Sequence, residues 1–127
     1  MTINEYQNLA MRTNDGLCNS RVLGKGLTYT TDRNEDSVNP GELINGVLGL
    51  TGEAGEVADM IKKYIFHRHD LDKEELVKEL GDVCWYVALL SYVIGVPLEE
   101  ILETNIEKLK KRYPRGFSEE NSINRTE

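Results

Sequence analysis

Residues 43–66 read LINGVLGLTGEAGEVADMIKKYIF, and this stretch decides the fold class. Its apolar side chains recur at the period of an α-helix and form a single stripe. Three signals mark the start of this helix: Asn39 can cap it, Pro40 suits the first turn, and Glu42 completes a capping box. We therefore expect a helix from about residue 40 to about Phe66.

Similar signals predict three further helices. They begin at Thr2, Asp72 and Pro97, and they end near residues 13–16, at Gly95 and before residues 113–114. In the last of them we expect Leu98, Leu102 and Leu109 to face the core. Residues 14–38 are expected to form a long loop with one short element near residues 26–31, and residues 118–127 a mobile tail. The expected fold is all-α, an antiparallel bundle of about four main helices in a single domain, residues 1–127.

Bulk properties limit the classes of function. The chain has 127 residues and a net charge of −7, which argues against binding a nucleic-acid polymer but not against a nucleotide. Its start has neither a basic segment nor an apolar run, and its longest apolar stretch, residues 83–96, is too short to span a membrane. Cys18 and Cys84 lie far apart and are expected to be free thiols. These features predict a cytoplasmic protein with no membrane partner.

Four carboxylates carry the chemical signal. Glu53 and Glu56 are spaced i, i+3 on one expected helix, and Glu79 and Asp82 have the same spacing on the next. Acids that face each other beside apolar stripes repel and lose solvation, and a hard divalent cation such as Mg²⁺ relieves both effects. The two pairs therefore predict a metal site between two helices. The alternative is two solvated helix faces, because acids at this spacing are common on surfaces.

Four glycines recur every third residue beside the first acidic pair, at positions 46, 49, 52 and 55. Each costs about 1 kcal/mol relative to alanine in a helix. Either close approach of another helix or room for a ligand would offset this loss.

Five other residues are candidates for binding a nucleotide. Lys63 lies on the same helix face as Glu56 and could reach a phosphate; the alternative is a surface lysine paired with Asp59. The ring of Tyr86, four residues after Asp82, could stack on a base, or it could pack in the core. Asn105, Lys108 and Arg112 could bind phosphate oxygens. The alternative to phosphate binding is that Asn105 is a buried amide with a structural role and that Lys108 and Arg112 are exposed basic side chains.

Taken together, these motifs resemble the MazG-like nucleoside triphosphate pyrophosphohydrolases of the all-α NTP pyrophosphatase superfamily. The resemblance covers most of the chain outside the expected loop and tail, and its segments are residues 6–13, 49–63, 79–86 and 105–114. The family pattern is E-E-x-x-E followed by E-x-x-D. Glu53, Glu56, Glu79 and Asp82 match all of its acids except the first, where this chain has Gly52.

The resemblance implies an activity and an assembly. It implies Mg²⁺, with Mn²⁺ as an alternative, held by the four acids, and cleavage of an NTP or dNTP to the monophosphate and pyrophosphate. It leaves open which acid is the general base. It also implies a homodimer or a dimer of dimers, which the nearly all-round apolar character of residues 83–94 favours independently. A second hypothesis is a non-catalytic helical oligomerisation or regulatory module that keeps the fold.

Overall fold

The computed structural model describes residues 1–26 and 38–125, and within these residues every regular element is a helix. The six helices are α1 (Ile3–Met11), α2 (Cys18–Gly24), α3 (Pro40–Phe66), α4 (Lys73–Val93), α5 (Leu98–Arg112) and α6 (Glu119–Ile123). The predicted all-α class is therefore confirmed.

The helix starts follow the predicted capping signals, with one exception. Thr2 and Glu5 form a complete capping box, and the side chain of Asn39 accepts a hydrogen bond from the backbone N–H of Glu42. The expected second half of the box at α3 is wrong. The Glu42 carboxylate is buried and instead accepts a hydrogen bond of 2.9 Å from Asn14 Nδ2, so it joins the segment after α1 to the start of α3.

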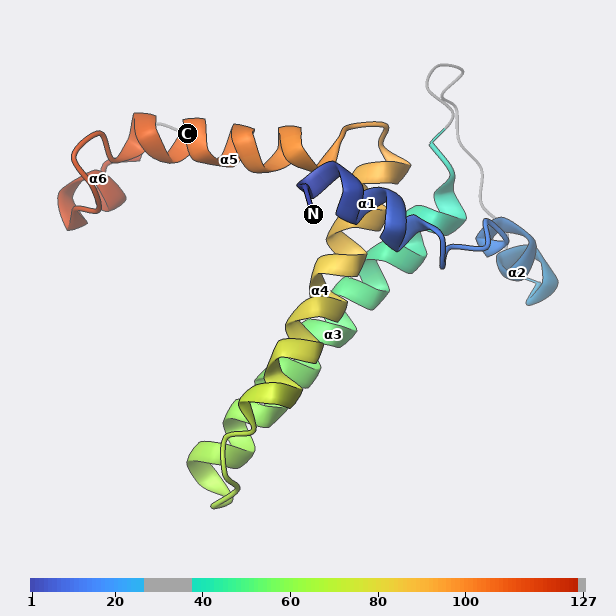
Figure 1. Ribbon diagram of the computed structural model, residues 1–127, viewed down its shortest axis with the longest axis horizontal. Coiled ribbons are helices and arrows are strands. Elements are labelled where there is room, and N and C mark those ends of the chain that lie inside the picture. Colours follow the sequence, from blue (N-terminus) through green and yellow to red (C-terminus); the bar gives the residue numbers. More distant parts are fainter. Residues whose placement is uncertain (27–37, 126–127) are drawn as a thin grey trace.

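A long antiparallel hairpin of α3 and α4 dominates the molecule (Figure 1). Helix α1 lies across the upper part of α4, and α5 leaves the end of α4 at an angle of 101°. The most deeply buried side chains, Ala88, Leu89 and Ser91, lie near this junction on α4. The core is therefore concentrated at one end of the hairpin, and the other end projects into solvent.

A buried amide fixes the junction. Gln7 Nε2 donates hydrogen bonds to Ala88 O (3.2 Å) and Ser91 Oγ (3.1 Å), and Gln7 Oε1 accepts one from Leu98 N (3.0 Å). The Ser91 hydroxyl in turn donates to Val96 O. A buried polar group without partners is costly, so this satisfied network specifies how α1, α4 and α5 meet.

Helix α5 departs from the expectation of a closed bundle within one chain. Leu98 is buried as expected, but Leu102 and Leu109 are 41% and 37% exposed, so the expectation that they face the core is wrong for one chain. The cause is the turn at Gly95, whose φ of 73° redirects the chain. Among the described residues, the antiparallel pairing involves α3 and α4, and most of α5 extends away from them (Figure 1).

Two short helices lie in segments that were expected to form a loop and a mobile tail, so these two expectations are wrong there. Helix α2 packs on α3, and Asn19 Oδ1 accepts a hydrogen bond of 2.7 Å from Gly41 N. Helix α6 begins at Ser118, whose hydroxyl accepts from Asn121 N at 3.1 Å. The short element expected near residues 26–31 lies almost entirely outside the described residues.

Taken singly, the described helices are all too short or too polar to cross a membrane. Only α4 and α5 counted together, across their bend of 101°, reach the required length and hydropathy.

Candidate metal and active site

Three carboxylates from two helices converge midway along the hairpin. Glu53 comes from the middle of α3, and Glu79 and Asp82 come from successive turns in the first half of α4. One carboxylate oxygen from each lies within 4.8 Å of the other two. Glu53 and Glu79 are half-buried and Asp82 is exposed, so the group opens toward solvent on the side of Asp82.

The electrostatics of this group centre on Glu79. Partial burial raises the pKa of the Glu79 carboxyl, and the negative charges of Glu53, Asp82, Glu56 and Glu75 raise it further, in that order. A carboxylate surrounded by like charges favours its protonated form or a bound cation. The repulsion between the acids that the sequence predicted is therefore present in the folded chain, where it acts on Glu79.

Glu56 lies next to this group rather than within it. It is exposed and is not one of the three converging acids, yet its charge contributes to the raised pKa of Glu79. The structure thus brings three of the four predicted ligands together and places the fourth within electrostatic range.

The donor set fits a hard divalent cation. Carboxylate oxygens are the ligands that Mg²⁺ and Mn²⁺ prefer, and Mg²⁺ commonly takes only one or two from protein and fills its octahedron with waters and phosphate oxygens. Three convergent carboxylates with one open side therefore leave coordination positions for a phosphorylated substrate.

Lys63 adopts the arrangement expected of a surface lysine. Its ammonium forms an ion pair of 2.7 Å with Asp59, which also pairs with Lys62 at 3.2 Å. The hydrogen bond and charge of Asp59 raise the pKa of Lys63, and the charge of Glu56 adds to this effect. Lys63 is therefore a fixed positive charge near Glu56, held by a carboxylate that a phosphate could replace.

The three candidates on α5 do not reach the acidic group within one chain. From Asp82, α4 continues for about 16 Å before the bend, and Lys108 lies about 15 Å along α5 at a rise of 1.5 Å per residue. Because the helices cross at 101°, roughly 20 Å separates these two backbone positions. Arg112 lies one turn farther, and Asn105 about one turn nearer, on the same outgoing helix (Figure 1).

The aromatic side chains on α4 have structural partners. The ring of Tyr86 packs directly on the backbone of α3 at Gly49, where a Cβ atom would overlap it. Trp85 Nε1 donates to Ala10 O (3.0 Å) and Thr13 Oγ1 (2.8 Å), which anchors the end of α1. Tyr86 is still only one turn from Asp82, so its predicted contact with substrate stays a prediction.

The glycines of α3 divide into two kinds. At Gly46 and Gly49 a Cβ would overlap Leu90 and Tyr86, so these two permit the close approach of α4. At Gly52 and Gly55, as at Gly81 on α4, a Cβ would meet nothing within 4 Å. The close-approach explanation therefore applies to half of the repeat, and the region beside Glu53 and Glu56 is open.

Tyr6 lies near the site, although the sequence predicted no functional role for it. Helix α1 brings it to α4, where burial raises the pKa of its phenol and the charges of Cys84 and Asp82 raise it further. No motif in the sequence pairs α1 with this part of α4. The buried Gln7 beside it is the signal that could have indicated a docked helix.

Comparison with known proteins agrees with this geometry. The family model for the MazG nucleotide pyrophosphohydrolase domain matches residues 44–117, which contain α4 and α5, nearly all of α3 and every acid of the site. The chain belongs to the MazG nucleotide pyrophosphohydrolase family.

Two curated relatives share part of its sequence. The chain is 38% identical to the Gene 37 protein of Mycobacterium phage L5 over 82 residues. The aligned region covers 61% of this chain and 72% of that protein. The chain is also 37% identical to the uncharacterized protein YvdC of Bacillus subtilis (strain 168) over 73 residues. The aligned region covers 50% of this chain and 69% of that protein. No solved structure gives a significant match.

Proposed function

We propose that this MazG-family protein is a Mg²⁺-dependent nucleoside triphosphate pyrophosphohydrolase, which cleaves an NTP or dNTP to the monophosphate and pyrophosphate. The observation that carries the proposal is the convergence of Glu53, Glu79 and Asp82 from two helices, within 4.8 Å of one another. The raised pKa of Glu79 supports it, because the repulsion among these acids favours a cation. Mn²⁺ satisfies the same donor set.

Each acid has a role in this scheme. Glu53, Glu79 and Asp82 hold the metal, which when bound polarises phosphate oxygens and makes a water more acidic. Glu56, exposed and outside the group of three, is free to orient the attacking water and accept its proton as the general base. Lys63 exchanges its Asp59 partner for the leaving pyrophosphate, whose charge it neutralises.

The proposed assembly is a homodimer or a dimer of dimers. The chain exposes 9940 Å² of surface, whereas a compact monomer of 14.4 kDa exposes about 6,800 Å² by the scaling of surface with mass. The excess is about 3,000 Å² per chain, and burial of only a third to a half of it on each of two chains would give the roughly 2,000–3,000 Å² total of a permanent dimer interface. Large apolar side chains are exposed on three helices: Leu43, Ile44, Val47, Leu48, Tyr64, Ile65, Phe66, Val77, Leu80, Tyr92, Leu102, Ile106 and Leu109.

Assembly also gives the bases of α5 a route to the substrate. Because Lys108 and Arg112 lie too far from the acids of their own chain, we propose that they, with Asn105, bind phosphates at the acidic group of another copy. Mixing two inactive variants tests this. If sites are shared, Glu53→Gln mixed with Arg112→Ala regains activity, because one site of the mixed dimer is intact. If each chain carries a whole site, the mixture stays inactive.

The direct test of the function is pyrophosphate release from each common NTP and dNTP, with Mg²⁺, Mn²⁺ or a chelator. We expect metal-dependent release that Glu53→Gln and Asp82→Asn abolish without unfolding the protein. No release from any nucleotide, together with no metal-dependent change in melting temperature, would instead favour the non-catalytic module. Ultracentrifugation showing a monomer at high micromolar concentration would refute the assembly.

A further inference from the structure

An exposed apolar face runs along α5. Leu102, Ile106 and Leu109 are 41%, 49% and 37% exposed. At 100° per residue they fall within an arc of roughly 60° around the helix. A groove with a volume of about 480 Å³ follows this face, and Ile3 of α1 also lines it. An amphipathic helix normally buries such a stripe, so this face lacks a cover among the described residues of one chain.

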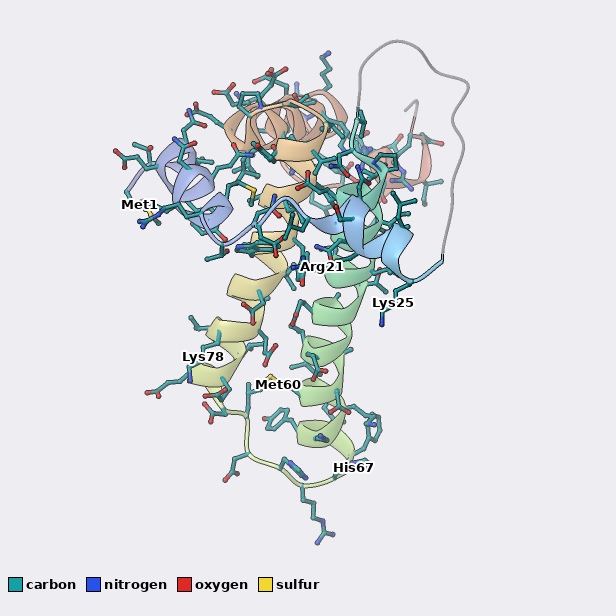
Figure 2. The ribbon with its side chains drawn as sticks, turned by 90° about the vertical axis from the view of Figure 1, so that its right-hand side faces the viewer. Met1, Arg21, Lys25, Met60, His67 and Lys78 are labelled. Atoms are coloured by element: carbon teal, nitrogen blue, oxygen red, sulfur yellow. The ribbon has the colours of Figure 1, made fainter. Side chains whose placement is uncertain are left out.

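The groove continues into an apolar pocket where α1 and α5 meet α4. Ile3 and Leu102 line both hollows. The pocket has a volume of about 560 Å³, and no side chain in its lining carries a charge at neutral pH. Figure 2 shows α1, with Met1 at its start, against the upper part of α4. The two hollows therefore form one continuous surface that extends from α4 along α5.

The charge of α5 is divided between its two halves. Residues 98–105 carry three acids and no base, whereas residues 106–112 carry four bases and one acid. Two copies of α5 packed in parallel would bring like charges together. Packed antiparallel, they would place the acidic half of each copy against the basic half of the other. The charge of this helix is therefore complementary to a second copy of itself in the antiparallel direction.

One register satisfies both the apolar face and its charged edge. When Ile106 lies opposite Ile106 of the second copy, Leu102 lies opposite Leu109 to within one residue. The same register brings Glu103 opposite Lys110, and both of these side chains line the groove. Lys110 already pairs with a carboxylate of its own chain, one turn away, at 3.1 Å. Its ammonium would therefore bridge two carboxylates, one from each copy.

We propose that α5 packs antiparallel against α5 of a second copy along this groove, centred on Ile106, with reciprocal ion pairs between Glu103 and Lys110. The proposal rests on the assembly put forward in the proposed function, and it assigns that assembly a face and a register. It requires no movement of the groove walls, because the hydrogen bonds of Gln7 and Trp85 hold α1 against α4 and the start of α5.

The end of α5 fits the same register. The rings of Tyr113 and Phe117 lie 5.4 Å apart, and Phe117 is 74% exposed. In the antiparallel pair these rings lie beside the first turn of α5 in the other copy, where Leu98 lines the apolar pocket. An uncharged pocket suits an aromatic pair, so the pairing covers both ends of the exposed face.

The pairing leaves the phosphate-binding candidates of α5 free. Lys108 and Arg112 lie roughly 140–180° around the helix from Glu103 and Lys110. They therefore project from the opposite flank of α5 and stay available for the acidic group of another copy.

Reversal of the two charges tests the pairing. Glu103→Lys and Lys110→Glu are coexpressed, with a tag on one of them so that their masses differ, and purified at low salt because salt screens exposed ion pairs. Each variant paired with itself has like charges at both contacts, whereas a mixed pair has opposite charges at both. With chains in equal amounts, we expect native mass spectrometry to find roughly nine-tenths mixed pairs, against the half expected from random pairing.

The matched control reverses two charges at nearly the same register on another face. Glu100 and Lys111 lie roughly 120–140° around the helix from Ile106, outside the groove. Glu100→Lys coexpressed with Lys111→Glu changes the charges of the same halves of α5, so its effect on each helix alone is similar. We expect random pairing for this control.

The other outcomes are distinguishable. Random pairing of the groove variants, in dimers that still form, overturns the α5 pairing and leaves the proposed assembly standing. Equal enrichment of mixed pairs in the groove and control variants overturns the assigned face. A wild-type protein that stays monomeric at high micromolar concentration overturns the assembly and the pairing together.

A cross-link tests the register independently of affinity. A disulfide needs two Cα atoms within about 7 Å, which the proposed centre provides at Ile106. Ile106→Cys is made together with Cys84→Ser, because Cys84 is exposed and Cys18 is buried. With a mild oxidant we expect a disulfide-linked dimer, and Thr104→Cys, on the far side of α5, should form little. No cross-link at position 106, or equal cross-linking at both positions, refutes the register.

Discussion

Two glycines of α3 provide a matched test of how closely the hairpin is packed beside the acidic group. Gly49 and Gly55 lie in the same helix, but a Cβ at position 49 would overlap the Tyr86 ring, whereas one at position 55 would meet nothing within 4 Å. Each is to be replaced by alanine. The gain in helix propensity is the same at both positions, so the difference between the two variants isolates the steric cost against Tyr86.

The magnitudes follow from this geometry. Gly55→Ala gains about 1 kcal/mol of stability, which is roughly 4 °C in Tm for a domain of this size. Gly49→Ala gains the same amount but incurs an overpacking cost of about 1–3 kcal/mol, because an aromatic ring held between two helices has little room to move. We therefore expect the Tm values of the two variants to differ by roughly 4–12 °C, with Gly49→Ala the lower.

The assay is thermal unfolding without metal, at one protein concentration, followed by Mg²⁺ titration of both variants. Gly49 lies one turn before Glu53, and Tyr86 one turn after Asp82, so forcing α3 from α4 at this level separates the carboxylates. Weaker Mg²⁺ binding by Gly49→Ala, with unchanged binding by Gly55→Ala, is the expected result. Equal Tm shifts in the two variants would refute the close packing of α3 on α4.

Three further predictions concern the acidic group and its lysine. Mg²⁺ at ten times its dissociation constant should stabilise the wild type by about 1.4 kcal/mol, and Glu53→Gln or Asp82→Asn should lose most of this gain in thermal melts. The folded chain holds the Glu79 proton more tightly than the unfolded chain does, so without metal this group costs stability as pH rises above its ordinary pKa. In urea unfolding with a chelator, the free energy of unfolding of Glu79→Gln should therefore increase relative to that of the wild type as pH rises. A difference between the two proteins that does not change with pH would contradict the raised pKa of Glu79. In steady-state kinetics, Lys63→Met should slow turnover far more than Lys63→Arg, with Asp59→Asn as the control for loss of the ion pair; equal rates in all three would remove Lys63 from the reaction.

The sequence predicted what depends on local pattern. The periodic apolar stripe and the caps at Thr2, Asn39 and Asp72 located the main helices, because short-range backbone and side-chain bonds set these features. The i, i+3 spacing placed Glu79 and Asp82 on one face of α4. Glu53 approaches Glu79 and Asp82 because two consecutive helices joined by a short turn pair with each other. The local sequence pattern also favours this pairing.

Long-range contacts were not predictable in the same way. The direction of α5 depends on the positive φ of Gly95 and on the buried Gln7 network, which links residues far apart in the chain. Lys108 and Arg112 were predicted to bind phosphate oxygens, but the direction of α5 keeps them away from the acids of their own chain. Likewise the sequence predicted no role for Tyr6, because its proximity to Asp82 arises only when α1 docks on α4.

The most direct test of the central claim is phosphorus NMR of the first products formed from a nucleoside triphosphate, recorded with Mg²⁺ and again with a chelator. If the acidic group holds a metal that activates attack at the α-phosphorus, the spectrum with Mg²⁺ shows nucleoside monophosphate and pyrophosphate in equal amounts, and the spectrum with chelator shows unchanged substrate. Diphosphate and orthophosphate as first products, or equal turnover in chelator, would contradict it.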